Sequence, residues 1–164
     1  MPYAVTHVLI TILILDLFRH YVFGKEKFPR YLVVLGGIAG LAPDIDIPLG
    51  WFYTLITGTP INLHGLFTHS FIFPLLFLLA ASLLYWKGNK QWAAISLVIA
   101  AGWFLHPILD CSFGGYKNLF WPLPWATSFC PEWGISAQYA SIDAILLVVW
   151  MVHEEVHKRI KDYL

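Results

Sequence analysis

Charged residues are scarce in this chain. Only 12% of its 164 residues are charged, whereas 59% are hydrophobic and the mean hydropathy is +0.67. Soluble domains carry roughly 25% charged residues, so the composition excludes an ordinary soluble protein and indicates an integral membrane protein. The net charge is zero, which gives no indication of a nucleic-acid partner. The length suits one domain, which we expect to cover residues 1–164.

Cysteine is scarce as well, which excludes a thiolate metal cluster. The two cysteines, Cys111 and Cys130, leave two alternatives open. They form a disulfide on the outer side of the membrane, or they are unpaired thiols in apolar surroundings. The start of the chain lacks the basic segment and the small-residue cleavage site of a secretory signal, so we interpret it as the first membrane span.

Long apolar runs, in contrast, are abundant. A membrane-spanning helix needs about 20 mostly apolar residues, and five segments qualify: 4–23, 31–50, 66–86, 91–112 and 135–153. The sequence therefore predicts an all-α polytopic membrane helix bundle with about five transmembrane helices. A loop of about fifteen residues is expected between the second and third spans.

A long aromatic segment, residues 112–133, is expected to lie along the outer interface between the fourth and fifth spans. It would serve either as a lid that recruits lipid or as an ordinary interfacial anchor.

Basic residues gather on the connections that share one side of this topology. Eight lie there, namely Lys25, Lys27, Arg30, Lys87, Lys90, Lys158, Arg159 and Lys161, whereas the opposite loops carry only Lys117. The positive-inside rule then places the amino terminus outside and the carboxyl terminus in the cytoplasm. We expect a multi-pass protein of the cell membrane.

Seven acids and imidazoles fall at the predicted outer ends of the spans. They are His7, Asp44, Asp46, His64, His69, His106 and Asp110. Ionisable groups cost several kcal/mol at membrane depth, so their gathering at one level indicates a functional site.

Two of the motifs have informative spacings. His106 and Asp110 are four residues apart and share one face of a helix, which Pro107 bends. Asp44 and Asp46 are two apart, so both carboxylates can reach one site only from non-helical backbone. Such backbone is tolerated in a membrane where it lines a polar cavity.

The third motif holds two imidazoles five residues apart. His69 is expected in the first turn of the third span, with Thr68 as its cap, and His64 just before the helix.

Imidazole and carboxylate donors without thiolate suit Zn, Mn, Fe or Ni, and we expect zinc first. Seven ligands exceed what one tetrahedral ion needs, which favours two or more ions. Such sites activate water and stabilise displacement at phosphorus. Asp46 or Asp143 is the candidate catalytic base.

Asp143 has two other interpretations, since it could hold a ligand histidine in its tautomer or make a lone hydrogen bond between helices. Near the inner ends, Asp16 is expected to pair locally with Arg19 and His20. His153 and His157 are expected to be solvated.

Four segments in order carry a resemblance to a known family. Residues 41–46, 64–70, 105–110 and 119–125 read LAPDID, HGLFTHS, LHPILD and LFWPLPW. Together with His7 they resemble the membrane-bound metal-dependent hydrolases described as LexA-regulated inner-membrane proteins, over residues 7 to about 125. The motif style is similar to that of zinc-dependent phospholipase C. The resemblance implies a metal-dependent hydrolase acting on an ester, first of all a phosphoester of a lipid or lipid-linked substrate.

One departure from the family pattern concerns the substrate. Family members commonly carry an arginine where this chain has Gly65. An arginine would clamp a phosphate, so its absence weakens the phosphate expectation without touching the metal ligands. Lys117 could substitute. Two alternatives remain: a metal-binding transport or sensing protein without hydrolytic activity, and a structural membrane protein with a polar core.

Overall fold

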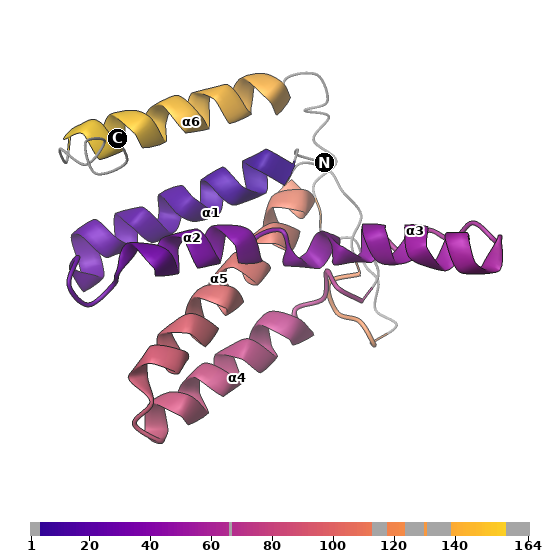
Figure 1. Ribbon diagram of the computed structural model, residues 1–164, viewed down its shortest axis with the longest axis horizontal. Helices are drawn as coiled ribbons and strands as arrows, with labels where there is room; N and C mark the ends of the chain where they lie inside the picture. Colours follow the sequence, from indigo (N-terminus) through magenta and orange to yellow (C-terminus); the bar gives the residue numbers. More distant parts are fainter. Residues whose placement is uncertain (1–3, 66, 113–117, 124–129, 131–138, 157–164) are drawn as a thin grey trace.

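The described part of the chain is all-helical. The computed structural model describes residues 4–65, 67–112, 118–123, 130 and 139–156, and no strand occurs among them. The helices are α1 (Ala4–Phe18, continued by a π-helical turn to Phe23), α2 (Arg30–Ala39), α3 (Asp46–Thr57), α4 (Ile72–Trp86), α5 (Lys90–Ser112) and α6 (Tyr139–Val156). In Figure 1, α6, α1 and α2 lie side by side, and α4 and α5 form a hairpin that crosses them.

Two helices are long and apolar enough to cross a membrane. They are the continuous helix Ala4–Phe23 and α5, and α2 with α3 would form a third span bent by 46°. These confirm the first and fourth predicted segments. The helix α4 has 15 residues, which span about 22 Å and fall short of a hydrocarbon core of about 30 Å. By length and composition, the described residues thus provide two or three spans, fewer than the five predicted.

The second predicted segment differs most from expectation. Instead of one helix over 31–50, α2 ends at Ala39, a 3-10 turn covers Ala42–Ile45, and α3 continues to Thr57 through half of the expected loop. Pro48 lies in the first turn of α3, where proline is tolerated, so nothing stops the helix before Gly58. Gly58 ends it in the left-handed conformation, with a φ of 67°.

The third predicted segment begins later than expected. Residues 67–71 form turns, and α4 starts only at Ile72, whose N–H is accepted by Ser70 Oγ. Pro74 is the third residue of the helix, where a missing N–H costs nothing. His69 therefore lies before the helix rather than in its first turn, and Thr68 does not cap it.

Glycines let the helices approach closely near the site. A Cβ on Gly102 of α5 would lie 2.3 Å from the carbonyl oxygen of Gly36 in α2. A Cβ on Gly36 would in turn lie 2.1 Å from Leu15 Cδ1 of α1. Small residues of this kind allow backbone-to-backbone packing in membrane proteins. Leu15 and Val98 are buried beside this contact and belong to the small apolar core.

Polar contacts attach α6 to the rest of the bundle. Thr6 Oγ1 of α1 donates a hydrogen bond to Asp143, and Arg30 of α2 lies 3.8 Å from Glu154. These two links join α6 to two different helices.

A third link corrects an expectation. His153 Nδ1 lies 2.9 Å from Asp16 Oδ2, and its side chain is only 12% exposed, so the expectation of a solvated His153 is wrong. Asp16 also pairs locally with Arg19 and His20, at 3.6 and 3.3 Å, as predicted. His157 lies outside the described residues.

Candidate metal centre

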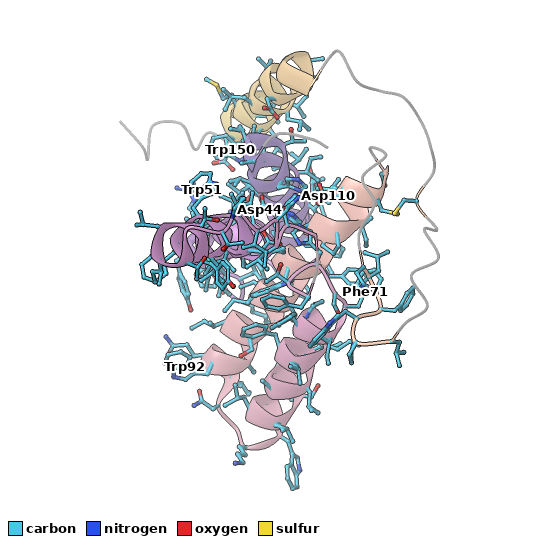
Figure 2. The ribbon with its side chains drawn as sticks, turned by 90° about the vertical axis from the view of Figure 1, so that its right-hand side faces the viewer. Asp44, Trp51, Phe71, Trp92, Asp110 and Trp150 are labelled. Atoms are coloured by element: carbon cyan, nitrogen blue, oxygen red, sulfur yellow. A yellow bond between two sulfur atoms is a disulfide. The ribbon has the colours of Figure 1, made fainter. Side chains whose placement is uncertain are left out.

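The structure brings the seven outer acids and imidazoles into one cluster. His7 comes from α1, Asp44 from the 3-10 turn, Asp46 from the start of α3, His64 and His69 from the turns before α4, and His106 and Asp110 from α5. Each lies within 4.0 Å of at least one other member. Figure 2 shows Asp44 and Asp110 close together near the middle of the molecule. Their role as ligands stays a prediction.

Four donor atoms form the centre of the cluster. His69 Nε2 lies 3.2 Å from His106 Nε2, 3.6 Å from Asp44 Oδ1 and 3.5 Å from Asp110 Oδ2. His106 Nε2 lies 3.4 Å from each of these two carboxylate oxygens. A tetrahedral ion with bonds of about 2.0–2.1 Å separates its donor atoms by about 3.3–3.4 Å. The spacing therefore fits one tetrahedral ion with two imidazole and two carboxylate donors.

The tautomers of the two central imidazoles favour a cation between them. His106 Nδ1 lies 2.6 Å from the carbonyl oxygen of Gly40, which can only accept, so this nitrogen carries the proton. His69 Nδ1 likewise faces a carboxylate oxygen of Asp46 at 3.2 Å. In the neutral form of both imidazoles, the Nε2 atoms then present lone pairs toward each other and toward Asp44 and Asp110. Four acceptors converge on one point, which a bound cation would stabilise.

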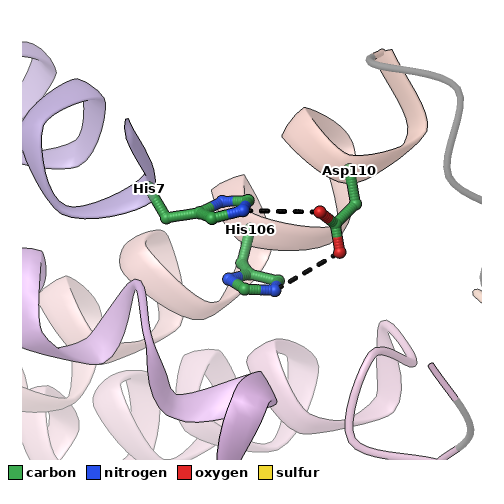
Figure 3. Close-up of side chains that lie close together, drawn as sticks. All are labelled: His7, His106 and Asp110. Atoms are coloured by element: carbon green, nitrogen blue, oxygen red, sulfur yellow. Dashed lines mark ion pairs between the residues drawn. The ribbon is translucent and has the colours of Figure 1, made fainter. Parts of the chain in front are cut away.

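His7 extends the cluster through the second oxygen of Asp110. His7 Nε2 lies 3.3 Å from Asp110 Oδ1, and its ring stacks on His106 with centroids 3.9 Å apart (Figure 3). His7, His106 and Asp110 each offer a ligand atom within 4.8 Å of the others. The two oxygens of Asp110 therefore face different imidazoles, an arrangement in which one carboxylate can bridge two ions.

Asp46 lies behind the imidazoles rather than among the central donors. Its side chain is fully buried. It accepts hydrogen bonds from Gly65 N at 3.0 Å and Thr68 Oγ1 at 2.8 Å. It also faces His64 Nδ1 at 3.1 Å and His69 Nδ1 at 3.2 Å. Four donors thus occupy this carboxylate, which orients two imidazoles.

At position 65, where the hydrolases that the sequence resembles commonly carry arginine, the backbone conformation favours glycine. Its φ of 81° lies in the left-handed region that favours glycine. In this conformation its N–H points to Asp46 Oδ2, and its carbonyl oxygen accepts a hydrogen bond from Asn118 N at 3.1 Å. Lys117, the expected substitute for the arginine, lies outside the described residues.

Asp143 has no described contact with the seven residues. Its carboxylate accepts the hydrogen bond from Thr6 Oγ1, which joins α6 to α1 beside His7. This geometry agrees with the interpretation of a hydrogen bond between helices.

Two positioning groups were missed by sequence reasoning. The carbonyl of Gly40 holds His106, and the hydroxyl of Thr68 holds Asp46. Thr68 stands next to His69 in the recognised motif, so its position beside a candidate ligand could have indicated a positioning role. A backbone carbonyl such as that of Gly40 cannot be identified from the sequence, because every residue has one.

Cys111 and Cys130 form a disulfide, which decides between the two alternatives left open. The bond ties the end of α5, one residue after Asp110, to the long aromatic segment.

The described part of that segment packs beside the cluster. Ser70 Oγ donates to the carbonyl of Trp121, and Phe71 N donates to the carbonyl of Leu119, both at 2.9 Å. These contacts hold the turns that carry His69. The rest of the aromatic segment, 113–117, 124–129 and 131–133, lies outside the described residues.

Comparison with known proteins gives one match. The model of the family described as YdjM inner membrane protein matches residues 1–160. No curated protein and no solved structure matches the chain.

Proposed function

The chain belongs to the YdjM inner membrane protein family. On the geometry of its polar cluster, we propose that it is a membrane-embedded, metal-dependent hydrolase. The observation that carries the proposal is the group of four donor atoms with spacings of 3.2–3.6 Å. They come from three separate parts of the chain and fit a tetrahedral ion. With both imidazoles neutral, their Nε2 atoms and the two carboxylates are all acceptors, a set that a cation satisfies better than contacts within the protein do.

The chemistry of the donor atoms indicates which metal ions the site would bind. It consists of imidazole nitrogens and carboxylate oxygens, which suit zinc first and Mn, Fe or Ni as alternatives. Asp110 as a bridge, with one oxygen facing His7 and the other facing His106, supports two or more ions. Bound in this way, divalent ions supply an activated water and stabilise charge on the oxygens of an ester undergoing displacement.

His64 is the best placed group for proton transfer. Its ring is 25% exposed and lines a cavity of about 370 Å³ together with Asp46 and Asn62. The buried Asp46 orients this ring at 3.1 Å, in the carboxylate–imidazole pairing of general acid–base catalysis. In this proposal Asp46 acts through His64 as a positioning residue, and Asp143 is not needed.

The substrate we propose is an ester in a lipid or lipid-linked molecule, most simply a phosphoester. The site lies between apolar helices of a membrane protein, where membrane lipid is the most abundant ester. With Gly65 in place of the arginine, the metal ions themselves would have to hold a phosphate.

We further propose that the site faces the outer side, with the amino terminus outside, the carboxyl terminus in the cytoplasm and five spans in all. The distribution of basic residues supports this orientation. The disulfide beside Asp110 supports it independently, because disulfides persist in oxidising compartments.

Metal analysis and an ester panel test the proposal together. Purified protein should contain stoichiometric zinc and should hydrolyse a phospholipid or a generic phosphoester until a chelator is added. His106→Ala should lose both properties, whereas His157→Ala, in the basic carboxyl-terminal segment, should keep them. Metal-replete protein without turnover, or turnover insensitive to chelator, contradicts a metal-dependent hydrolase.

Transport or sensing of metal is the second candidate, and one observation favours it. Asp16, His20 and His153 form another group whose ligand atoms lie within 4.8 Å of one another, further along α1. Nine residues separate it from His7, about 14 Å along a helix. Metal flux into proteoliposomes that His106→Ala abolishes would favour this candidate.

A further inference from the structure

An apolar groove leads to the cluster from the lipid-facing side. It has a volume of about 650 Å³ and lies where the start of α1, the end of α2 and the start of α3 meet. Its walls are aliphatic, with Leu35, Ile38, Ile45 and Ile47 among them, and Asp44 is the one charged residue in its lining. Sites for small molecules have volumes of about 300–1,000 Å³, so the groove is large enough for a hydrocarbon chain.

Asp44 connects the groove to the donor atoms. Its Oδ1 lies 3.4 Å from His106 Nε2, and its side chain is 24% exposed. The carboxylates of Asp46 and Asp110 are 0% and 2% exposed. A molecule in the groove therefore meets the cluster at Asp44.

A second, more polar cavity adjoins the groove at Ile47, which lines both. It is lined by Asp46, Asn62 and His64 and has a volume of about 370 Å³. Asp44 lines the apolar groove and His64 lines the more polar cavity, and His64 Nδ1 lies 3.8 Å from Asp44 Oδ1, so the two spaces meet at this edge of the cluster. This order matches an amphiphile, with the hydrocarbon chain on one side of its ester and the headgroup on the other.

We propose that the groove holds the hydrocarbon chain of an amphiphilic ester, which enters sideways from the bilayer and places its ester at Asp44. The inference rests on the proposed hydrolase and names its substrate class. Ile38 and Ile45 are 61% and 53% exposed, so the groove is open to the surrounding lipid. Walls this apolar would leave the polar backbone of an extended peptide unsatisfied, which argues against such a peptide as the occupant.

The groove would orient the chain rather than bind it tightly. A hydrocarbon chain that moves from lipid into an apolar groove exchanges one apolar surface for another, and the gain in free energy is small. Its contribution is to hold the ester in place, which lowers the entropic cost of the reaction.

Crosslinking tests the groove without any hydrolysis. A lipid with a diazirine at the end of its acyl chain is placed in vesicles with metal-free protein, irradiated, and the labelled residues are mapped by mass spectrometry. Labelling should concentrate on Leu35, Ile38 and Ile47. Ile38→Trp, which fills the groove, should lower the labelling at Leu35 and Ile47 about tenfold, the effect of a hydrocarbon group that no longer fits a pocket.

Val34→Trp is the matched control. Val34 lies on the same helix and is 54% exposed, but it does not line the groove. Should Ile38→Trp fail to fold, Ala4→Trp fills the groove from α1, with the neighbouring Val5→Trp as its control. Labelling spread evenly over the lipid-facing surface, or equal labelling in groove and control variants, overturns the proposal.

Kinetics separates this inference from the proposed function. With a long-chain ester, Ile38→Trp should raise KM about tenfold, and with a short, water-soluble ester it should leave KM unchanged. Equal effects on both esters overturn the groove proposal. If the unmodified, metal-loaded protein hydrolyses neither ester, the hydrolase proposal fails, and the crosslinking pattern still decides whether the groove holds a chain.

Discussion

The central imidazoles each use one nitrogen for support and leave the other for a ligand. His106 is held by the carbonyl of Gly40, and His69 faces the carboxylate of Asp46. Supports of this kind fix the ring orientation and raise the basicity of the ligand. Asp44 and Asp46, only two residues apart, therefore have different roles, one as a donor and one as a support.

This difference predicts that substitution of Asp46 lowers the affinity for zinc, whereas substitution of Asp44 lowers the number of ions bound. Asp46→Asn should weaken zinc binding about 10–100-fold while keeping the stoichiometry, because the four central donor atoms stay and only the support of His64 and His69 is impaired. Asp44→Asn should lower the stoichiometry itself, because a donor atom is lost. Competition with a zinc-binding dye in detergent measures both, with Asp162→Asn in the carboxyl-terminal segment as the control. If Asp46→Asn lowered the stoichiometry and Asp44→Asn only the affinity, Asp46 would be the donor and Asp44 the support.

The residue types of the site could be predicted from the sequence. Which carboxylate is a donor and which supports an imidazole could not. Acids and imidazoles are costly in apolar helices, so their positions alone indicated a site at one end of the spans. Whether a carboxylate faces the centre or the back of an imidazole depends on the path of the backbone. That path, with its 3-10 turn before Asp46 and the left-handed Gly65, follows from packing between segments far apart in the sequence.

At the scale of helices, the site depends on how closely α5 approaches α2. The hydrogen bond from His106 to Gly40 crosses between these helices, and Gly102 makes room for it. A Cβ on Gly102 would meet backbone atoms of Gly36 and Gly40, at 2.3 and 2.9 Å, which cannot move aside as a flexible side chain can.

Gly102→Ala should therefore both destabilise the protein and loosen the site. Overpacking of this kind costs about 1–3 kcal/mol, and we expect a lower Tm together with weaker zinc binding. Gly50→Ala is the matched control, since a Cβ there would meet its nearest neighbour at 3.4 Å, an ordinary contact. Thermal unfolding in detergent, followed by tryptophan fluorescence, gives the comparison. Equal Tm values for the two variants would show that α2 and α5 need no close approach.

Hydropathy predicted helices better than it predicted where they end. The first and fourth segments matched because nothing interrupts a long apolar run. The second did not, because a 3-10 turn at Ala42–Ile45 interrupts it, and the third did not, because the turns at 67–71 that carry His69 are as apolar as a span. Windows of hydropathy cannot distinguish the turns at 67–71 from the helix that follows.

At the scale of the whole molecule, the orientation in the membrane can be tested with the native cysteines in place. Cys111 and Cys130 are joined in a disulfide, so introduced thiols can be labelled against a low background. With an impermeant maleimide on intact cells, Thr59→Cys should be labelled and Asn89→Cys should not. Both positions are exposed. Labelling of position 89 in intact cells would contradict the proposed orientation.

The links between α6 and the other helices have a consequence for how the protein is made. Asp143 and Glu154 lie in an apolar helix that follows α1 and α2 in the chain, and acidic side chains are costly in an apolar helix without partners. Thr6 and Arg30 are their partners, so α6 gains its place only after α1 and α2 are already in the membrane. A chain halted after α5 would display Asp16 without His153. Such a chain keeps the local pairing of Asp16 with Arg19 and His20 and lacks only the link from Asp16 to α6.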